Sequence, residues 1–196
     1  MKKIYSNLAN FVTIVGIFTA TWSIILTIQG ATGLLNFSLI VATEATDFLD
    51  GIIARWLGIE SLFGSILDRF RDKLFTCSQF FFMFATFWNI PSFFATTILS
   101  LLAIMVGIEL CLFFAGLYGL AKKLPVEANR WGKRKMFLQC FIINWWALFY
   151  HLTPFNLEIS NFSVLLSFVL VLSVGNYLAY KSISGYWEIY FNSSPA

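Results

Sequence analysis

Long apolar runs without charged residues fill most of the chain, and short turn signals separate them. A helix needs about 20 mostly apolar residues to cross the hydrocarbon core of a bilayer, and the runs approach or exceed that length. Glycine and proline mark the turns, as at Gln29-Gly30, at Gly33 and between Asn89 and Ser92. The pattern predicts six transmembrane helices, over Phe11–Ile28, Leu34–Leu57, Ser65–Trp88, Phe93–Ala121, Met136–Leu152 and Phe162–Tyr180.

The composition is typical of a polytopic membrane protein and not of a soluble domain. Of the 196 residues, 59% are hydrophobic and 12% are charged, and the mean hydropathy is +0.77. We expect one domain over residues 1–196, an all-α integral membrane protein built as a six-transmembrane-helix bundle. Residues 1–9 are expected to form a short N-terminal interfacial segment, and no cleavable signal peptide is expected.

The distribution of charge gives the bundle an orientation. Six spans place both termini on one side of the membrane, and all 13 basic residues of the chain fall on that side. Among the acidic residues, only Glu158 falls clearly on the other side. Loops rich in lysine and arginine remain in the cytoplasm, so we expect a multi-pass protein with both termini cytoplasmic.

Four aspartates gather within one stretch of this apolar chain. Asp47 and Asp50 lie near the end of the second expected helix, and Asp68 and Asp72 lie near the start of the third. Residues three or four positions apart share a helix face, so each pair forms a row. Gly58 is suited to end the first of these helices, and a helical hairpin then brings the two rows together at the cytoplasmic surface.

The chemistry of this stretch suits a diphosphate and a metal ion. Carboxylates that face each other repel unless a cation lies between them, and hard oxygen ligands favour Mg²⁺, Mn²⁺ or Ca²⁺ over zinc. Arg55 offers a fork of donors to phosphate, while Gly51 and Gly64 allow close approach of the backbone to a ligand. Displacement at phosphorus also needs a base for the attacking hydroxyl, and any of the four aspartates could serve.

The stretch resembles the signature of the CDP-alcohol phosphotransferase family, D-x2-D-G-x2-A-R-x8-G-x3-D-x3-D. Every fixed position matches between Asp47 and Asp72, including the eight-residue gap from Arg55 to Gly64. The resemblance implies a six-helix membrane bundle, usually a homodimer. It also implies a transferase that moves a substituted phosphate from a CDP-alcohol to an acceptor alcohol and releases CMP.

The resemblance also implies roles for the matching residues. Asp47, Asp50 and Asp68 correspond to ligands of Mg²⁺ or Mn²⁺ that hold the diphosphate. Asp72 corresponds to the general base and to a further metal ligand. The positions that surround the CDP moiety are Gly51, Ala54, Arg55 and Gly64.

A basic segment, expected as a loop over Lys122–Lys135, is the candidate acceptor site. It resembles the G-K-x-K-x-x-x-Q region of phosphatidylglycerophosphate synthases, which suggests glycerol 3-phosphate as acceptor. One departure is that this branch usually carries an arginine before the glutamate of the fourth span, where this chain has Ile108 before Glu109. The same charges are equally suited to touching anionic lipid. The candidate acceptor-binding residues are Arg130, Lys133, Arg134 and Lys135.

Other functions stay open at this point. The same chemistry could use CDP-diacylglycerol with another acceptor: phosphatidylglycerol, as in cardiolipin synthases, inositol phosphate or serine. Intramembrane carboxylates also occur in divalent-cation transporters, but the chain shows no internal repeat and its aspartates lie at one surface. Nothing indicates nucleic-acid binding. Glu109 is expected to face the bundle interior and His151 the far membrane interface, while the roles of Glu44, Arg69 and Arg71 are open.

Overall fold

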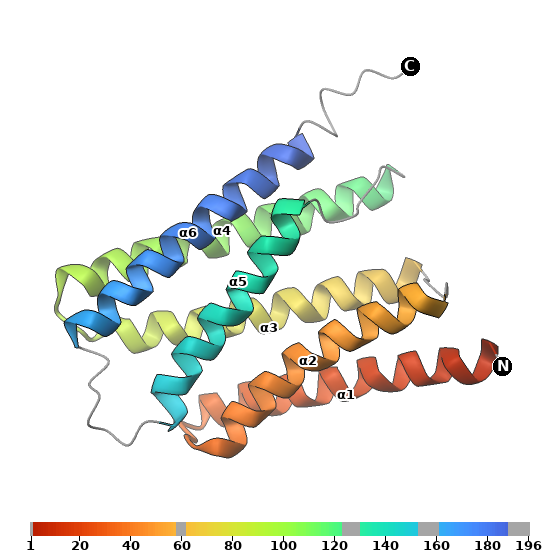
Figure 1. Cartoon of the computed structure of the whole chain (residues 1–196), viewed down its shortest axis with the longest axis horizontal. Helices are drawn as coiled ribbons and strands as arrows, with labels where there is room; N and C mark the ends of the chain where they lie inside the picture. The colour runs from red at the N-terminus through yellow and green to blue at the C-terminus, as the bar shows by residue number, and fades with distance from the viewer. Residues whose placement is uncertain (1, 58–61, 123–129, 153–160, 188–196) are drawn as a thin grey trace. The chain divides into compact units, whose positions relative to one another are not determined.

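The computed structural model describes the backbone of residues 2–57, 62–122, 130–152 and 161–187. It describes side chains for residues 14–49, 70–119, 122, 130–152 and 161–187. The described residues form helices and contain no strand, as expected for an all-α protein (Figure 1). Six α-helices and one π-helical turn make up this part of the chain. They are α1 (Lys2–Ile28), α2 (Leu34–Leu57), α3 (Leu62–Trp88), α4 (Phe93–Ala121), α5 (Arg130–Ala147), η1 (Leu148–Leu152) and α6 (Phe162–Trp187).

The helix ends follow from local chemistry. Gly30 and Gly33 adopt φ angles of 68° and 121°, which L side chains rarely adopt, and they close the turn between α1 and α2. Pro91 cannot continue a helix, and the Ser92 hydroxyl then accepts a hydrogen bond of 3.0 Å from the Ala95 amide as the N-cap of α4. Asn161 caps α6 in the same manner, with its side-chain oxygen 3.3 Å from the Ser163 amide.

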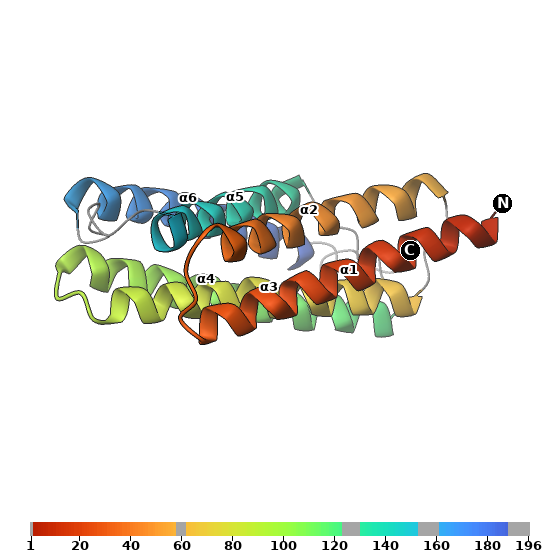
Figure 2. The same ribbon diagram turned by 90° about the horizontal axis from the view of Figure 1, so that it is seen from below.

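The chain falls into two compact units that we describe separately. Unit 1 contains residues 1–79 and 144–156, and unit 2 contains residues 80–143 and 157–196. In unit 1, α1 packs along α2, and α2 also contacts η1. In unit 2, α4 packs along α6. Both pairs run side by side in the two perpendicular views of Figure 1 and Figure 2.

A buried polar network ties the α1–α2 hairpin of unit 1 to η1. Asn36 is 1% exposed; its side chain accepts from Ser23 at 2.8 Å and donates to Thr27 at 2.9 Å. The Asn36 amide nitrogen also lies 3.5 Å from His151 Nε2. His151 is therefore buried against this hairpin, whereas the sequence suggested an interfacial residue. Its ring packs on Trp146 and Tyr150, which supply the buried environment.

A glycine and an aromatic pair mark the packing of the helices in unit 2. A Cβ atom on Gly175 of α6 would lie 2.6 Å from the Met105 methyl of α4 and 3.4 Å from Ile142 of α5. Phe87 and Phe168 of the same unit pack edge to face, with ring centroids 5.3 Å apart. Gly175 thus leaves space that the side chains of the neighbouring helices fill, and small residues are common at contacts between membrane helices.

Membrane character is clear for two of the helices. Among the residues whose side chains the structure describes, Phe93–Gly119 and Phe162–Trp187 are long and apolar enough to cross a bilayer, and Ile14–Ile28 is a shorter apolar helix. Several large apolar side chains are exposed, Phe93 at 80% and Phe137 at 77%, which a lipid-facing surface accommodates. The expectations of six spans and of a single domain stay predictions.

Two expected boundaries differ in the structure. The interfacial segment expected over residues 1–9 is not a separate element, because α1 is one helix from Lys2 to Ile28. The basic segment expected as a loop to Lys135 becomes helical at Arg130, where α5 begins; residues 123–129 lie outside the described residues. Lysine and arginine favour helices about as strongly as leucine does, so their charge did not imply a loop.

The close approach at Gly175 gives a stability prediction. Gly175→Leu should destabilise the protein by about 1–3 kcal/mol, because the new side chain overpacks the α4–α6 contact. Gly107→Leu is the matched control, since nothing lies within 4 Å of a Cβ at that glycine of α4. Thermal unfolding in detergent would measure both. Equal losses for the two variants would show that Gly175 has no special packing role.

Candidate active site

The two halves of the aspartate motif lie on two helices of unit 1. The segment Asp47–Arg55 belongs to α2 and the segment Gly64–Asp72 to α3, so both halves are helical as the sequence predicted. The structure describes the side chains of Asp47 and Asp72. The other motif side chains lie outside the described residues, as does the turn expected at Gly58, and their assigned roles stay predictions. They are Asp50, Gly51, Ala54, Arg55, Gly64 and Asp68.

Asp47 is held by an arginine of the neighbouring motif helix. The Arg71 guanidinium on α3 forms an ion pair with Asp47 of α2, and the two side chains are only 4% and 15% exposed. Charge-assisted hydrogen bonds of this kind are stronger than neutral ones, and burial from water strengthens them further. The pair therefore joins the two halves of the motif directly, a role that the sequence had left open for Arg71.

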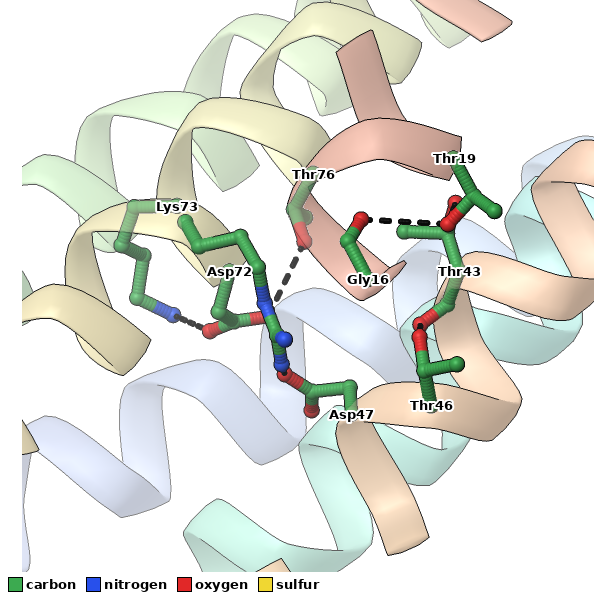
Figure 3. A network of polar contacts seen from close by, with 9 residues as sticks. Gly16, Thr19, Thr43, Thr46, Asp47, Asp72, Lys73 and Thr76 are labelled. Atoms are coloured by element: carbon green, nitrogen blue, oxygen red, sulfur yellow. Dashed lines mark hydrogen bonds and ion pairs between the residues drawn. The ribbon is translucent and has the colours of Figure 1, made fainter. Parts of the chain in front are cut away.

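Asp72 is held by two residues of its own helix. Lys73 donates to one carboxylate oxygen at 3.0 Å, and the Thr76 hydroxyl lies 3.4 Å from the other oxygen (Figure 3). The Asp72 side chain is 25% exposed, more than that of Asp47. A carboxylate with both oxygens oriented and one side open to solvent is suited to receive a proton from a bound hydroxyl.

Threonines hold α1 against α2 beside these carboxylates. Thr43 of α2 donates to the Thr19 hydroxyl of α1 at 3.0 Å, and Thr19 in turn donates to the Gly16 carbonyl at 3.1 Å (Figure 3). The Thr46 hydroxyl, one residue before Asp47, bonds the Thr43 carbonyl at 2.9 Å. These threonine hydrogen bonds, called the threonine ladder below, hold α2, which carries the first half of the motif, against α1.

Glu44 adds a third described carboxylate to the cluster. It interacts electrostatically with both Asp47 and Asp72, and it accepts a hydrogen bond from the Asn144 amide of α5. Its second oxygen, Oε1, is buried and has no hydrogen-bond partner among the described residues. The sequence left the role of Glu44 open, and its spacing of one helical turn before Asp47 was the signal that it lies near the motif. Its tie to Asn144 had no signal in the sequence.

The donor chemistry of this cluster fits a hard divalent cation. Asp47 and Asp72 supply carboxylate oxygens, and the sequence adds Asp50 and Asp68 on the same two helices. Among the side chains that the structure describes, no group of three histidine, cysteine, aspartate or glutamate residues is placed to hold a metal ion. The four-aspartate ligand set is therefore a prediction supported by the residue types and by the pairing of α2 with α3 through Arg71.

The candidate acceptor residues lie in unit 2, at the start of α5. Arg130, Lys133 and Arg134 are exposed, and the Arg134 guanidinium lies 5.2 Å from the centre of the Trp131 ring. A stacked guanidinium remains able to bind an anion through its edge. These three residues thus present positive charge on the first turns of a helix.

Lys135 behaves differently from the other basic residues of α5. It is 5% exposed, and its ammonium forms an ion pair with Glu109 of α4, which is fully buried. Gln139, one turn further along α5, donates to the same Glu109 oxygen at 2.6 Å. Glu109 faces the interior, as expected for a carboxylate within a span. Acceptor binding by Lys135 stays a prediction, but its ammonium already has a buried structural partner.

A comparison with known families agrees with the motif. A family model described as CDP-alcohol phosphatidyltransferase matches residues 6–176, which includes α2, α3 and the start of α5. No individual curated protein and no solved structure matches the chain significantly.

The buried pair in unit 2 gives a prediction that separates structure from binding. Lys135→Met should cost about 3–5 kcal/mol of stability, because it leaves the Glu109 carboxylate buried without its cation. Adding Glu109→Leu should recover most of this loss, since the second change removes the uncompensated charge. Lys133→Met, on the exposed side of the same helix, is the control.

Thermal unfolding in detergent would measure these variants. The account is contradicted if Lys135→Met unfolds at the wild-type temperature and alters only the KM of an acceptor, because Lys135 would then act in binding.

Proposed function

The chain belongs to the CDP-alcohol phosphatidyltransferase family, and from that membership we propose that it makes a membrane phospholipid from CDP-diacylglycerol and glycerol 3-phosphate. Enzymes of the family are transferases of substituted phosphate groups that join a CDP-alcohol donor to an alcohol acceptor in phospholipid biosynthesis. The proposed reaction transfers the phosphatidyl group to the acceptor hydroxyl and releases CMP. Family membership favours this reaction over divalent-cation transport.

One observation carries the proposal. The motif from Asp47 to Asp72 is complete in the sequence, and its two halves lie on helices that Arg71 joins through Asp47. A set of carboxylates in so apolar a chain is costly unless a function requires it. Binding a diphosphate through a divalent cation is such a function.

Each motif residue has a separate role in the proposed reaction. Asp47, Asp50, Asp68 and Asp72 would hold Mg²⁺ or Mn²⁺, which when bound neutralises the diphosphate oxygens and the leaving group. Arg55, Gly51, Ala54 and Gly64 would surround the CDP moiety. Asp72 takes the proton of the acceptor hydroxyl, and Lys73 and Thr76 keep its oxygens oriented for this step. The hydroxyl oxygen then bonds to the phosphorus that carries the lipid, and the bond from that phosphorus to CMP breaks.

Glycerol 3-phosphate is the proposed acceptor because basic side chains gather on α5. Arg130, Lys133 and Arg134 are exposed and suited to a phosphomonoester, by bidentate contacts from arginine and a point charge from lysine. Lys135, also a candidate, has Glu109 as a partner. Phosphatidylglycerol, inositol phosphate and serine remain the alternative acceptors that the sequence raises.

The setting of the reaction is a membrane. Two apolar helices and the family support a membrane protein. We further propose six spans, both termini and the active site on the cytoplasmic side, and a homodimer. In that orientation a soluble acceptor and the lipid tails of CDP-diacylglycerol both reach the ends of α2 and α3.

The division of roles predicts different defects for two aspartates. Asp72→Asn should abolish turnover while CDP-diacylglycerol still binds, because a base is needed only for the reacting hydroxyl. Asp50→Asn should weaken metal-dependent binding of the CDP moiety itself. Titration of CDP-diacylglycerol into both purified variants would decide, and an equal loss of binding would remove the separate role of Asp72.

The acceptor assignment predicts a selective change in KM. Arg130→Ala and Lys133→Ala should each raise the KM of glycerol 3-phosphate roughly ten- to hundredfold, the value of a charged hydrogen bond of about 1.5–3 kcal/mol. The KM of CDP-diacylglycerol should stay nearly constant. Lys122→Ala, an exposed lysine just past α4, is the control for general surface charge.

An acceptor panel completes this test. Glycerol 3-phosphate and inositol phosphate would be compared with serine, inositol and phosphatidylglycerol. Turnover with only an acceptor that lacks a phosphomonoester would refute both glycerol 3-phosphate and the role of α5.

A further inference from the structure

Arg71 places a permanent positive charge inside the aspartate cluster. It lies between Asp68 and Asp72 in the sequence, and its side chain is only 4% exposed. A guanidinium keeps its charge in proteins, so its burial requires a negative partner. The structure supplies that partner in Asp47, the first carboxylate of the motif.

The Arg71 guanidinium packs closely against α1. A Cβ atom on Gly16 of α1 would lie 2.5 Å from Arg71 Nη1 and 3.3 Å from its Cζ atom. The same Cβ would lie 2.9 Å from the Thr46 hydroxyl, next to Asp47. A glycine at this position leaves room for the guanidinium, which a larger side chain would displace. Residues of α1, α2 and α3 therefore enclose the Arg71–Asp47 pair, unlike a surface ion pair that forms by chance.

The surrounding charges explain why a fixed cation is useful. Glu44 interacts electrostatically with Asp47 and Asp72, so three acidic side chains lie near one another in a partly buried site, where a negative charge is costly without a cation. Lys73 pairs with Asp72 and compensates that end of the cluster. Arg71 compensates the Asp47 end from a more deeply buried position, with 4% of its side chain exposed against 21% for Lys73.

We propose that Arg71 is a built-in counter-cation of the aspartate cluster: it neutralises Asp47 when no divalent ion is bound, stabilises the fold in that state and lowers the affinity for the ion. This inference rests on the proposed metal-dependent function. Two positive charges that share one carboxylate repel each other, so arginine and divalent ion compete for Asp47. The site is then folded before metal arrives and binds its metal reversibly.

Direct metal binding and metal-free stability test the proposal without an activity assay. The purified full-length protein would be titrated with Mn²⁺ and followed by electron paramagnetic resonance, and its unfolding temperature would be measured in chelator and in saturating Mn²⁺. Arg71→Gln should lower the metal-free unfolding temperature by about 5–15 °C, and Mn²⁺ should recover most of that loss. The same variant should bind Mn²⁺ roughly tenfold or more tightly than wild type.

Matched variants separate charge from packing. Arg71→Lys keeps the positive charge and should stay near wild type in both measurements. Gly16→Ala should displace the guanidinium and shift both measurements in the direction of Arg71→Gln, which keeps the test valid if Arg71→Gln does not fold. Gly107→Ala, where a Cβ meets open space, is the control for the glycine change.

Two results would overturn the proposal. A loss of stability in Arg71→Gln that Mn²⁺ does not recover would make Arg71 a packing residue. Weaker Mn²⁺ binding by Arg71→Gln would mean that Arg71 only orients a metal ligand. If the wild-type protein binds no Mn²⁺, the metal-dependent function fails, while a comparison of Arg71→Gln with Arg71→Lys in chelator still decides whether Arg71 is the counter-charge.

Discussion

Neutralisation of buried charge is the constraint on which the rest of this structure depends. Each unit encloses a carboxylate together with a basic side chain from another helix: Asp47 with Arg71 in unit 1, and Glu109 with Lys135 in unit 2. An unpaired charge at such a depth would cost several kcal/mol, which is comparable to the whole stability of a typical domain. We therefore expect each ion pair to favour the helix faces that bring its two charges together.

The same need to neutralise buried charge applies to the candidate active site. The proposed chemistry needs several carboxylates in one place, and their mutual repulsion opposes folding. Arg71 and Lys73 reduce that repulsion, while the threonine ladder between Thr19 and Thr43 and the glycine at position 16 bring α1 against the site. In the proposed function, the two cations of α3 let the fold hold the cluster before a divalent ion binds to it.

The helices could be predicted well from the sequence, and the side-chain pairs could not. The helix ends at Ile28 and Trp88 follow from turn residues that act locally, and the apolar runs correctly predicted that both motif halves are helical. The pairing of Arg71 with Asp47 depends on the register between α2 and α3, which no local pattern encodes. The basic run predicts acceptor binding for Lys135 together with Arg130, Lys133 and Arg134, whereas the structure buries Lys135. Its spacing of four to Gln139, which is also buried, is the signal in the sequence.

The most direct test of this account is CMP release from CDP-diacylglycerol by the purified wild-type protein as the divalent ion is varied. With glycerol 3-phosphate present, the account predicts no CMP release in EDTA and full recovery when Mg²⁺ or Mn²⁺ is added in excess, because the clustered aspartates hold the diphosphate through the ion. Undiminished CMP release in EDTA would contradict it, since the motif from Asp47 to Asp72 would then act on the diphosphate without a metal.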